Sequence, residues 1–199
     1  ETGGYTAGTP VPADSPIRDN IADAVRRVRE TTPLAQSFTN FVTINLVANA
    51  QLAAGGTAAM SFLPDDVESA TGAAVALAQY LTEQHAKHSS HDASTRCAVA
   101  VSGIADLVTD GETVYRLPGG SAMMTKITGA GCSLGGVAAT YLAVSDPLTA
   151  ALSASLLYNR AGEVADTTSH GPGSFQVAFL DALWNVTAEQ VAESEILVQ

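Results

Sequence analysis

A glycine-bearing turn that runs directly into an apolar helical pattern constrains this chain more than any other feature. The turn is Thr125-Lys126-Ile127-Thr128-Gly129-Ala130-Gly131-Cys132-Ser133. Glycines allow a ligand to approach closely, and the first turn of a helix presents unpaired N–H groups at the positive end of its dipole. The segment therefore predicts an anion-binding loop with a cysteine beside the anion. If this segment is considered without the rest of the sequence, an ordinary glycine turn is the competing interpretation.

The composition predicts one compact domain. The chain has 199 residues, of which 46% are apolar and 15% charged, enough to bury a single core. We expect residues 1–16 to form a flexible lead and residues 17–199 to form the domain. No apolar stretch approaches the roughly 20 residues that a membrane-spanning helix needs. The first residues also lack the basic segment followed by an apolar one that is typical of an export signal. Cys97 and Cys132 have no framework spacing, so we expect two free thiols in a reducing cytoplasm, with a disulfide as the alternative.

The charge balance limits the partners of the protein. A formal net charge of −11 argues against general affinity for nucleic acid or an anionic membrane, since both need clustered Lys and Arg. The chain has only two lysines, Lys87 and Lys126. A phosphate ligand would therefore be held by backbone amides and a metal ion more than by a basic patch.

Hydrophobic periodicity and turn residues predict an α/β fold with a parallel βαβ unit and an antiparallel edge hairpin. The hairpin turn is Asp110-Gly111. Helix starts are indicated by Asp146-Pro147 and by the capping-box pattern Thr187-Ala188-Glu189-Gln190. The expected strands cover residues 34–38, 57–62, 97–103, 104–109 and 113–117. The expected helices run from Ile17 to before Pro33, from Thr39-Asn40 to about Ala53, over 64–81, with a stripe over 134–142, over 147–165 and 174–184, and from Thr187.

Three stretches have both a structural and a functional interpretation. The tract of His85, His88 and His91 has the residue types of a metal site, but a solvated loop is the better interpretation because nothing rigid would hold ligands in geometry. Arg26, Arg27 and Arg29 are expected on a solvated helix face. The helix over 41–53 is apolar almost all round, so we expect it to be covered by the sheet and by another subunit, with Val47 in that contact.

Four segments together resemble the hydroxyethylthiazole kinase family. They are residues 125–144 (TKITGAGCSLGGVAATYLAV), 171–191 (GPGSFQVAFLDALWNVTAEQV), 33–60, and Val101-Ser102-Gly103 with Asp106. The resemblance implies a ribokinase-like layered α/β/α domain with a mainly parallel sheet. It also implies a homotrimeric, ATP- and Mg²⁺-dependent transferase of thiamine (vitamin B1) biosynthesis, which phosphorylates the hydroxyl of 4-methyl-5-(2-hydroxyethyl)thiazole.

The resemblance implies roles for particular residues. Met60, Gly129 and Asn40 match substrate-binding positions, and Ser102 stands where the family has an ATP-contacting Thr. Thr128, Ala130 and Gly131 supply the loop that would bind the nucleotide. Cys132 occupies the position where sugar kinases of the fold carry an Asp base, and it serves as proton acceptor or positioning group; filling a small space is the alternative. No metal-binding residue is assigned.

The chain departs from the family pattern near residues 66 and 67. A central block of roughly 60 to 80 residues, about two βαβ units, is missing there, and it would hold the family's metal-binding carboxylates. Either the centre of a longer protein is absent from this sequence, which we favour, or the chain is truly shortened. The alternatives to the thiazole kinase are a non-catalytic thiazole-binding paralogue and a related small-alcohol kinase.

Overall fold

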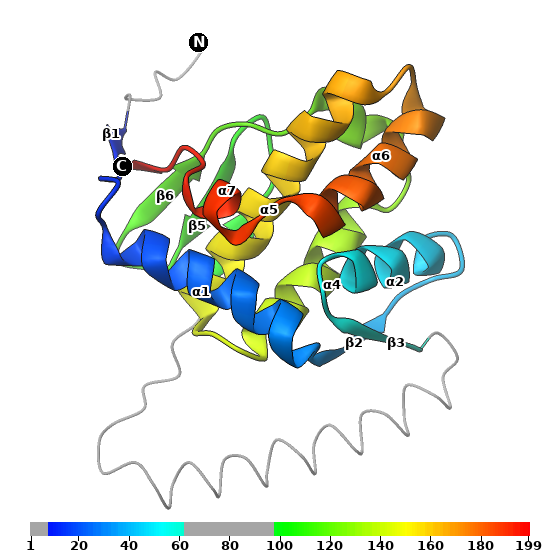
Figure 1. Cartoon of the computed structure of the whole chain (residues 1–199), viewed down its shortest axis with the longest axis horizontal. Helices are drawn as coiled ribbons and strands as arrows, with labels where there is room; N and C mark the ends of the chain where they lie inside the picture. Colours follow the sequence, from blue (N-terminus) through cyan, green and yellow to red (C-terminus); the bar gives the residue numbers. More distant parts are fainter. Residues whose placement is uncertain (1–7, 62–97) are drawn as a thin grey trace, which may run out of the picture.

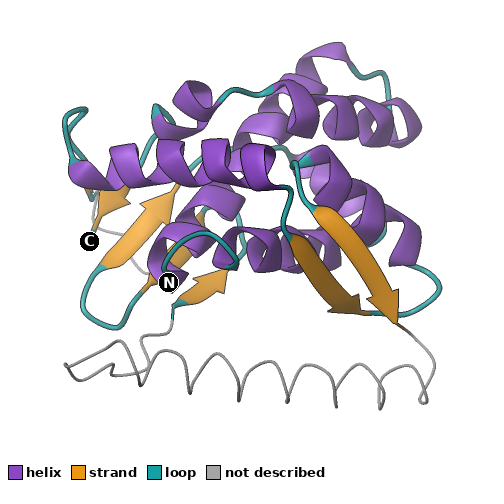
Figure 2. Ribbon diagram, turned by 60° about the horizontal axis from the view of Figure 1, so that its bottom comes forward, coloured by secondary structure: helices purple, strands orange, loops and turns teal. Residues whose placement is uncertain are grey.

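The computed structural model describes residues 8–61 and 98–199, which form a mixed α/β domain (Figures 1 and 2). The predicted helix over 64–81, the histidine tract, Cys97 and the junction near residue 66 lie outside these ranges. The strands are β1 (Thr9–Pro10), β2 (Leu34–Phe38), β3 (Thr57–Ser61), β4 (Val99–Val101), β5 (Asp106–Thr109), β6 (Val114–Leu117) and β7 (Leu197–Val198). The helices are α1 (Pro16–Thr31), α2 (Ile44–Ala53), α4 (Ala130–Leu142), α5 (Pro147–Thr168), α6 (Pro172–Asn185) and α7 (Ala188–Ala192), with a 3₁₀ helix η1 (Ala122–Lys126).

The predicted βαβ unit is confirmed. Strands β2 and β3 pair in parallel, with Leu34 opposite Thr57 and Ser37 opposite Met60, and α2 packs on both β3 and α4. The helix begins at Ile44, later than the expected start at residue 40. The Asn40 side chain instead accepts a hydrogen bond from the Val42 N–H at 2.9 Å, which forms a turn ahead of the helix.

The remaining described strands form an antiparallel sheet in the order β1-β7-β6-β5-β4. The predicted hairpin is present as β5 and β6, and its turn places Gly111 at φ +95°. Strands β1 and β7 have two residues each, too few for a recognisable alternation. Thr9 and Pro10 of the expected lead thus pair with the C-terminal strand. In Figure 2 both sheets lie along the lower side of the described chain, with helices above.

The interpretation of residues 97–103 as a buried parallel strand is wrong. Strand β4 covers only Val99–Val101 and pairs antiparallel with β5. Val99 is 55% exposed and Val101 is 57% exposed. The physical reason is that β4 is the edge strand of its sheet within the described residues, so no described strand covers its other side.

Helices α4 and α5 form the centre of the packing. Helix α5 packs on α4 and α6, and α4 packs in addition on α2. Phe175 and Phe179 stack with ring centroids 6.1 Å apart, and Tyr158 meets Phe179 edge-on at 5.1 Å. Asp146 caps α5 as expected by accepting from the N–H groups of Leu148 and Thr149. No helix in the described ranges has the length and apolar character needed to cross a membrane.

The expectation that Val47 lies at a subunit contact is wrong, because Val47 is buried between α2 and α4. Its side chain is 1% exposed. A Cβ added at Gly136 of α4 would lie 3.1 Å from Val47 Cγ1 and 3.1 Å from Gln51 Cδ. The two helices can pack this closely because Gly136 has no side chain.

The α1 arginines are not only a solvated face. Arg29 donates to the Val186 carbonyl, and Arg26 pairs with Glu189 at 2.8 Å. Arg18 donates to the carbonyls of Val11 and Ser194. The contacts with Val186, Glu189 and Ser194 join α1 to the C-terminal part of the chain. The capping box of Thr187 and Gln190, predicted from the sequence, is present at the start of α7.

Two adjacent glycines of α4 provide a matched test of the helix contact. A Cβ at Gly135 would meet nothing within 4 Å, whereas one at Gly136 would press on α2. We expect Gly135→Ala to stabilise the fold by about 0.5 to 1 kcal/mol through helix propensity. We expect Gly136→Ala to be about 1 to 3 kcal/mol less stable than Gly135→Ala because of overpacking. Urea unfolding followed by circular dichroism measures both, and equal stabilities would contradict this packing.

Candidate functional site

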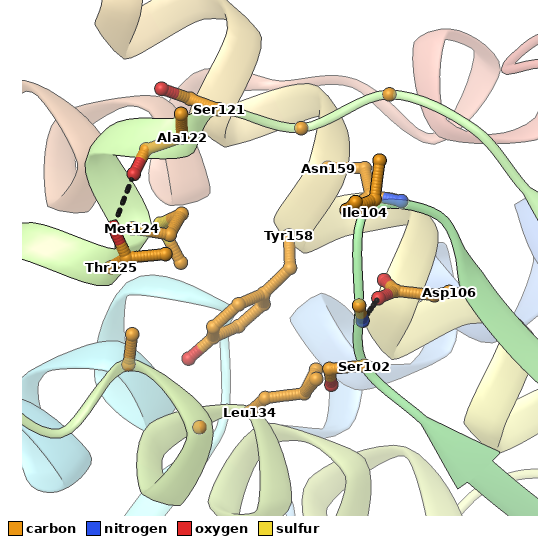
Figure 3. Close-up of a pocket in the computed structure, with 15 residues that line it drawn as sticks. Ser102, Ile104, Asp106, Ser121, Ala122, Met124, Thr125, Leu134, Tyr158 and Asn159 are labelled. Atoms are coloured by element: carbon orange, nitrogen blue, oxygen red, sulfur yellow. Dashed lines mark hydrogen bonds between the residues drawn. The ribbon is translucent and has the colours of Figure 1, made fainter. Parts of the chain in front are cut away.

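A cavity of about 620 Å³ lies where four segments of the chain meet. Its size suits a small-molecule ligand. The segments are the β4–β5 loop with the first residue of β5, the chain from Gly119 through η1, the first turns of α4 and the middle of α5 (Figure 3). The polar or conformationally special lining residues are Ser102, Gly103, Asp106, Gly119, Gly120, Ser121, Thr125, Gly131, Tyr158 and Asn159.

The start of α4 supplies one wall. Gly129 is the residue before the helix and has a φ of +93°, a conformation that favours glycine. The Ser133 N–H makes the first intrahelical bond, to the Gly129 carbonyl at 2.8 Å. The helix geometry leaves the N–H groups of Ala130, Gly131 and Cys132 without intrahelical partners. Because Ala130 and Gly131 line the cavity, this wall has the chemistry of an anion site.

Asp106 is the acidic residue among the lining residues. Its side chain is buried at 7% exposure, and it accepts a hydrogen bond from the Gly103 N–H at 3.0 Å. Burial raises the pKa of Asp106, and the hydrogen bond from Gly103 opposes that rise in part. The contact with Gly103 fixes the β4–β5 loop at the edge of the cavity.

Tyr158 of α5 supplies the floor of the cavity. In Figure 3 its ring crosses the space between η1 and the β4–β5 loop, and the residue is only 3% exposed. Burial raises the pKa of its hydroxyl, so the phenol is neutral over the physiological range. Met124 and Leu134 add apolar surface. The floor therefore suits a flat or apolar part of a ligand, and the α4 wall suits an anionic part.

The structure brings some of the sequence-predicted residues together at this cavity. Ser102, Ala130 and Gly131 line it. Thr128, Gly129 and Cys132 are not among the lining residues, although all three lie at the start of α4. Cys132 is exposed and forms no disulfide among the described residues.

The predicted substrate residues lie on the other side of the α4 start. A Cβ built at Gly129 would be 3.1 Å from Thr43 Cβ, so Gly129 faces the residue that precedes α2. The Thr43 N–H in turn bonds to the Asn40 carbonyl at 3.2 Å. Met60 lies in β3 opposite Ser37. Asn40 and Met60 thus lie near the carboxyl ends of parallel strands, where ligands bind in α/β sheets.

Sequence reasoning missed several lining residues. No role was assigned to Asp106, and Tyr158 and Asn159 look like ordinary helix residues. Gly119 and Gly120 have φ values of +120° and +82°. The signal for these two was the Pro118-Gly119-Gly120 sequence, which marks a turn with positive φ.

The described residues do not form a metal site by themselves. They contain no cluster of three or more His, Cys, Asp or Glu residues placed to hold an ion, and the cavity lining offers one carboxylate, that of Asp106. Mg²⁺ typically binds to one or two carboxylates together with substrate phosphates. No reaction step is therefore assigned to a metal held by these residues.

A glycine-started helix and a small-molecule cavity at the edge of an α/β fold are features of nucleotide-dependent transferases. The model of the hydroxyethylthiazole kinase family matches residues 80–189. Hydroxyethylthiazole kinase from Bifidobacterium longum (strain DJO10A) is 65% identical, with 98% of this chain and 96% of the relative covered. The protein of that name from Bifidobacterium animalis subsp. lactis (strain AD011) is 45% identical, with 94% and 93% covered. The chain belongs to the hydroxyethylthiazole kinase family.

A solved structure supports the same fold. The hydroxyethylthiazole kinase protein from Pyrococcus horikoshii OT3 matches with a TM-score of 0.73 at 23% identity, and the match covers 91% of this chain and 99% of that one. This likeness, together with the mixed parallel and antiparallel sheets, confirms the predicted fold class.

Asp106 gives the site a testable dependence on pH. Its raised pKa means that the protonated carboxyl is favoured in the folded protein. The contribution of Asp106 to stability is thus fully present below its unfolded pKa and is lost as the pH rises through the folded value. We expect Asp106→Asn, which can still accept from Gly103, to be at least as stable as wild type at pH 7. Urea unfolding between pH 3 and pH 7 tests this; a variant that is less stable than wild type at pH 7 would contradict it.

Proposed function

We propose that this protein transfers the γ-phosphoryl group of ATP to the hydroxyl of 4-methyl-5-(2-hydroxyethyl)thiazole, a salvage step of thiamine synthesis. Membership of the hydroxyethylthiazole kinase family and the matches to its curated members support the reaction class and the substrate. In the same proposal the protein is a cytoplasmic enzyme that uses Mg²⁺ with ATP.

The observation that carries the proposal is the position of the α4 start between two regions. On one side, Ala130 and Gly131 line the cavity. On the other side, Gly129 faces Thr43 and the turn that contains Asn40. A phosphate held by the first N–H groups of α4 would lie between a nucleotide in the cavity and an alcohol near Asn40 and Met60. Phosphoryl transfer depends mainly on this kind of positioning.

Nucleotide binding is assigned to Ser102, Thr128, Ala130 and Gly131. No Lys or Arg is among the described residues that line the cavity, and the whole chain is acidic. Backbone amides must therefore contribute much of the attraction for phosphate. When bound, Mg²⁺ would neutralise phosphate charge. Its protein ligands are assigned to the block that we propose is missing near residues 66 and 67.

Cys132 is assigned as the group that accepts the alcohol proton. The alcohol oxygen attacks the γ-phosphorus, the bond between that phosphorus and the bridging oxygen breaks, ADP departs, and the proton passes to the cysteine thiolate. Phosphoryl transfer depends mainly on positioning, so Cys132 assists the reaction and does not dominate it.

The length of the family alignment supports the missing block. The alignment with the Bifidobacterium longum (strain DJO10A) protein has 301 positions, whereas this chain has 199 residues. About a hundred positions therefore carry residues of the relative alone, which is more than the roughly 60 to 80 residues expected for two βαβ units. We place this block near residues 66 and 67, in the chain between β3 and β4. Val99 and Val101, exposed on the edge strand β4, would be covered by strands from the block.

Intact mass and activity distinguish the complete enzyme from a shortened binding protein. A mass near 20.3 kDa means that the chain is truly short, and a mass several kilodaltons higher means that the block is present. We expect the protein with the block to phosphorylate the thiazole alcohol with Mg²⁺ and ATP. Failure to turn over under these conditions would defeat the proposed function. Thiazole binding without Mg²⁺-dependent ATP binding, measured by calorimetry, would favour the non-catalytic paralogue.

Substitution of the cysteine tests its assigned role. We expect Cys132→Ser to lower kcat by roughly tenfold to a hundredfold, because a hydroxyl is a weaker proton acceptor than a thiolate. The Kd for ATP should stay unchanged. Cys97→Ser is the control, since it alters the other cysteine. Equal kcat values for Cys132→Ser and wild type would show that the thiol only fills space.

We propose that the protein is a homotrimer and that the exposed apolar residues before α2 contribute to its contacts. Phe41 is 72% exposed and Val42 is 75% exposed. We expect Val42→Asp to shift the sedimentation coefficient toward that of a monomer, because an uncompensated charge in an interface is costly. Val177→Asp, at a 63% exposed position of α6, is the matched control. A Val42→Asp variant that sediments as wild type would exclude this surface from the contact.

A further inference from the structure

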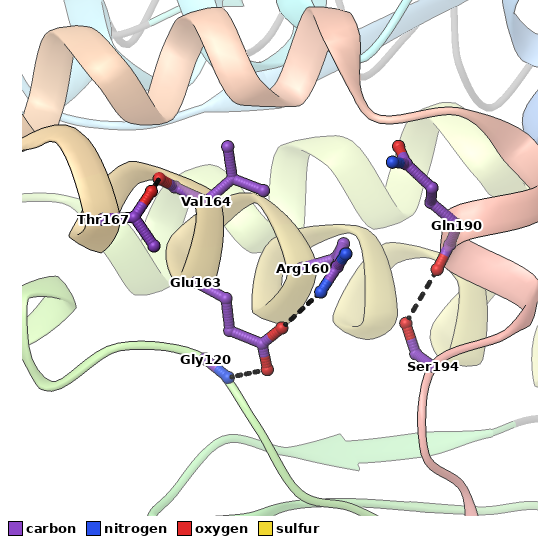
Figure 4. Close-up of polar contacts among 7 residues, drawn as sticks. All are labelled: Gly120, Arg160, Glu163, Val164, Thr167, Gln190 and Ser194. Carbon is purple, nitrogen blue, oxygen red and sulfur yellow. Dashed lines mark hydrogen bonds and ion pairs between the residues drawn. The ribbon is translucent and has the colours of Figure 1, made fainter.

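Glu163 of α5 lies behind the cavity and contacts one of its walls. Its Oε1 atom accepts a hydrogen bond from the Gly120 N–H at 3.3 Å, and its Oε2 atom pairs with Arg160 at 3.1 Å (Figure 4). The Glu163 and Arg160 side chains are each 40% exposed. Glu163 does not line the cavity itself. It lies one helical turn beyond Asn159, which is a cavity-lining residue.

The wall that Glu163 contacts is held in an unusual backbone conformation. Gly119 and Gly120 both have positive φ, which a residue with a side chain adopts only with strain. A Cβ on Gly119 would lie 2.5 Å from Glu163 Oε1, and a Cβ on Gly120 would lie 2.9 Å from Asn159 Oδ1. The backbone of this segment thus passes directly over two polar side chains of α5.

The same segment faces the ligand space. Gly119, Gly120 and Ser121 line the cavity together with the first turn of α4. The segment starts just after the buried end of β6, and its hydrogen bond to Glu163 joins it to α5, the central helix. A backbone N–H bound to a carboxylate makes a stronger hydrogen bond than one bound to a neutral group. Glu163 therefore fixes the position of the Gly119–Ser121 segment relative to α5.

We propose that Glu163 is a positioning residue for nucleotide binding. Its carboxylate holds the Gly119–Ser121 segment at the distance from α4 that a nucleoside triphosphate requires. This inference rests on the proposed function, because that proposal assigns the cavity to ATP. It does not involve the thiazole alcohol, whose assigned residues Asn40, Met60 and Gly129 do not line the cavity.

Three variants separate the hydrogen bond from the ion pair. Glu163→Ala removes both, Glu163→Gln keeps an oxygen that can accept from Gly120, and Arg160→Gln removes only the cation. We expect Glu163→Ala to weaken ATP binding about tenfold, the effect of one charge-assisted hydrogen bond. Glu163→Gln should restore affinity to within about threefold of wild type. The Kd of Arg160→Gln for ATP should stay within about twofold of the wild-type value, because half-exposed ion pairs contribute little binding or folding energy.

Calorimetry with ATP and, separately, with the thiazole alcohol is the binding experiment. The thiazole Kd should be unchanged in all three variants, which a general loss of structure would not produce. Amide exchange measured by NMR is the second readout. The Gly120 N–H should exchange faster in Glu163→Ala than in wild type or Glu163→Gln.

Distinct outcomes overturn the two proposals. If wild type binds no ATP, the proposed function fails, and the nucleotide role of Glu163 fails with it. If wild type binds ATP and Glu163→Ala binds it equally well, only the positioning role is wrong. Equal weakening of ATP and thiazole binding, or no rescue by Glu163→Gln, would likewise reduce Glu163 to a structural residue.

Discussion

The close contact between α2 and α4 is the constraint on which the rest of the site depends. The Gln51 amide is fully buried and donates to the Gly136 carbonyl at 3.1 Å and to the Ala35 carbonyl at 3.3 Å. One side chain thus joins β2, α2 and α4. A buried amide is costly unless it is hydrogen-bonded, so these bonds favour one relative position of the three elements. That position puts the start of α4 beside the turn before α2.

A second constraint acts from the opposite side of the cavity. Helix α5 is packed against α4 and α6, and its aromatic contact between Tyr158 and Phe179 fixes the floor of the ligand space. The same helix contacts the Gly119–Gly120 backbone through Asn159 and Glu163. The cavity walls are therefore a rigid helix start on one side and a glycine segment attached to a rigid helix on the other. Binding residues carried on such supports lose little entropy when a ligand arrives.

Local signals in the sequence predicted much of the fold. Asp146-Pro147 and the Thr187–Gln190 box set helix starts through contacts within a few residues, and Asp110-Gly111 set the hairpin in the same way. The β4 strand was misjudged because its apolar run does not reveal whether a neighbouring strand covers it. Val47 was misjudged for a related reason: an apolar helix face does not identify its partner. Both errors concern contacts between residues distant in the sequence.

The residues of the candidate site show the same difference between local sequence motifs and contacts of distant segments. Ala130 and Gly131 were found because the glycines and the helix start are adjacent in the chain, and Ser102 was found through the family resemblance. Asp106 lies in β5, whereas Tyr158 and Glu163 lie in α5, and only the folded chain brings the two elements together at the cavity and its wall. The residues that hold a ligand can therefore be found by motif or resemblance. The residues that position the ligand-binding residues can be found only in the folded structure. They are defined by contacts between segments distant in the sequence, and such contacts leave no local sequence pattern.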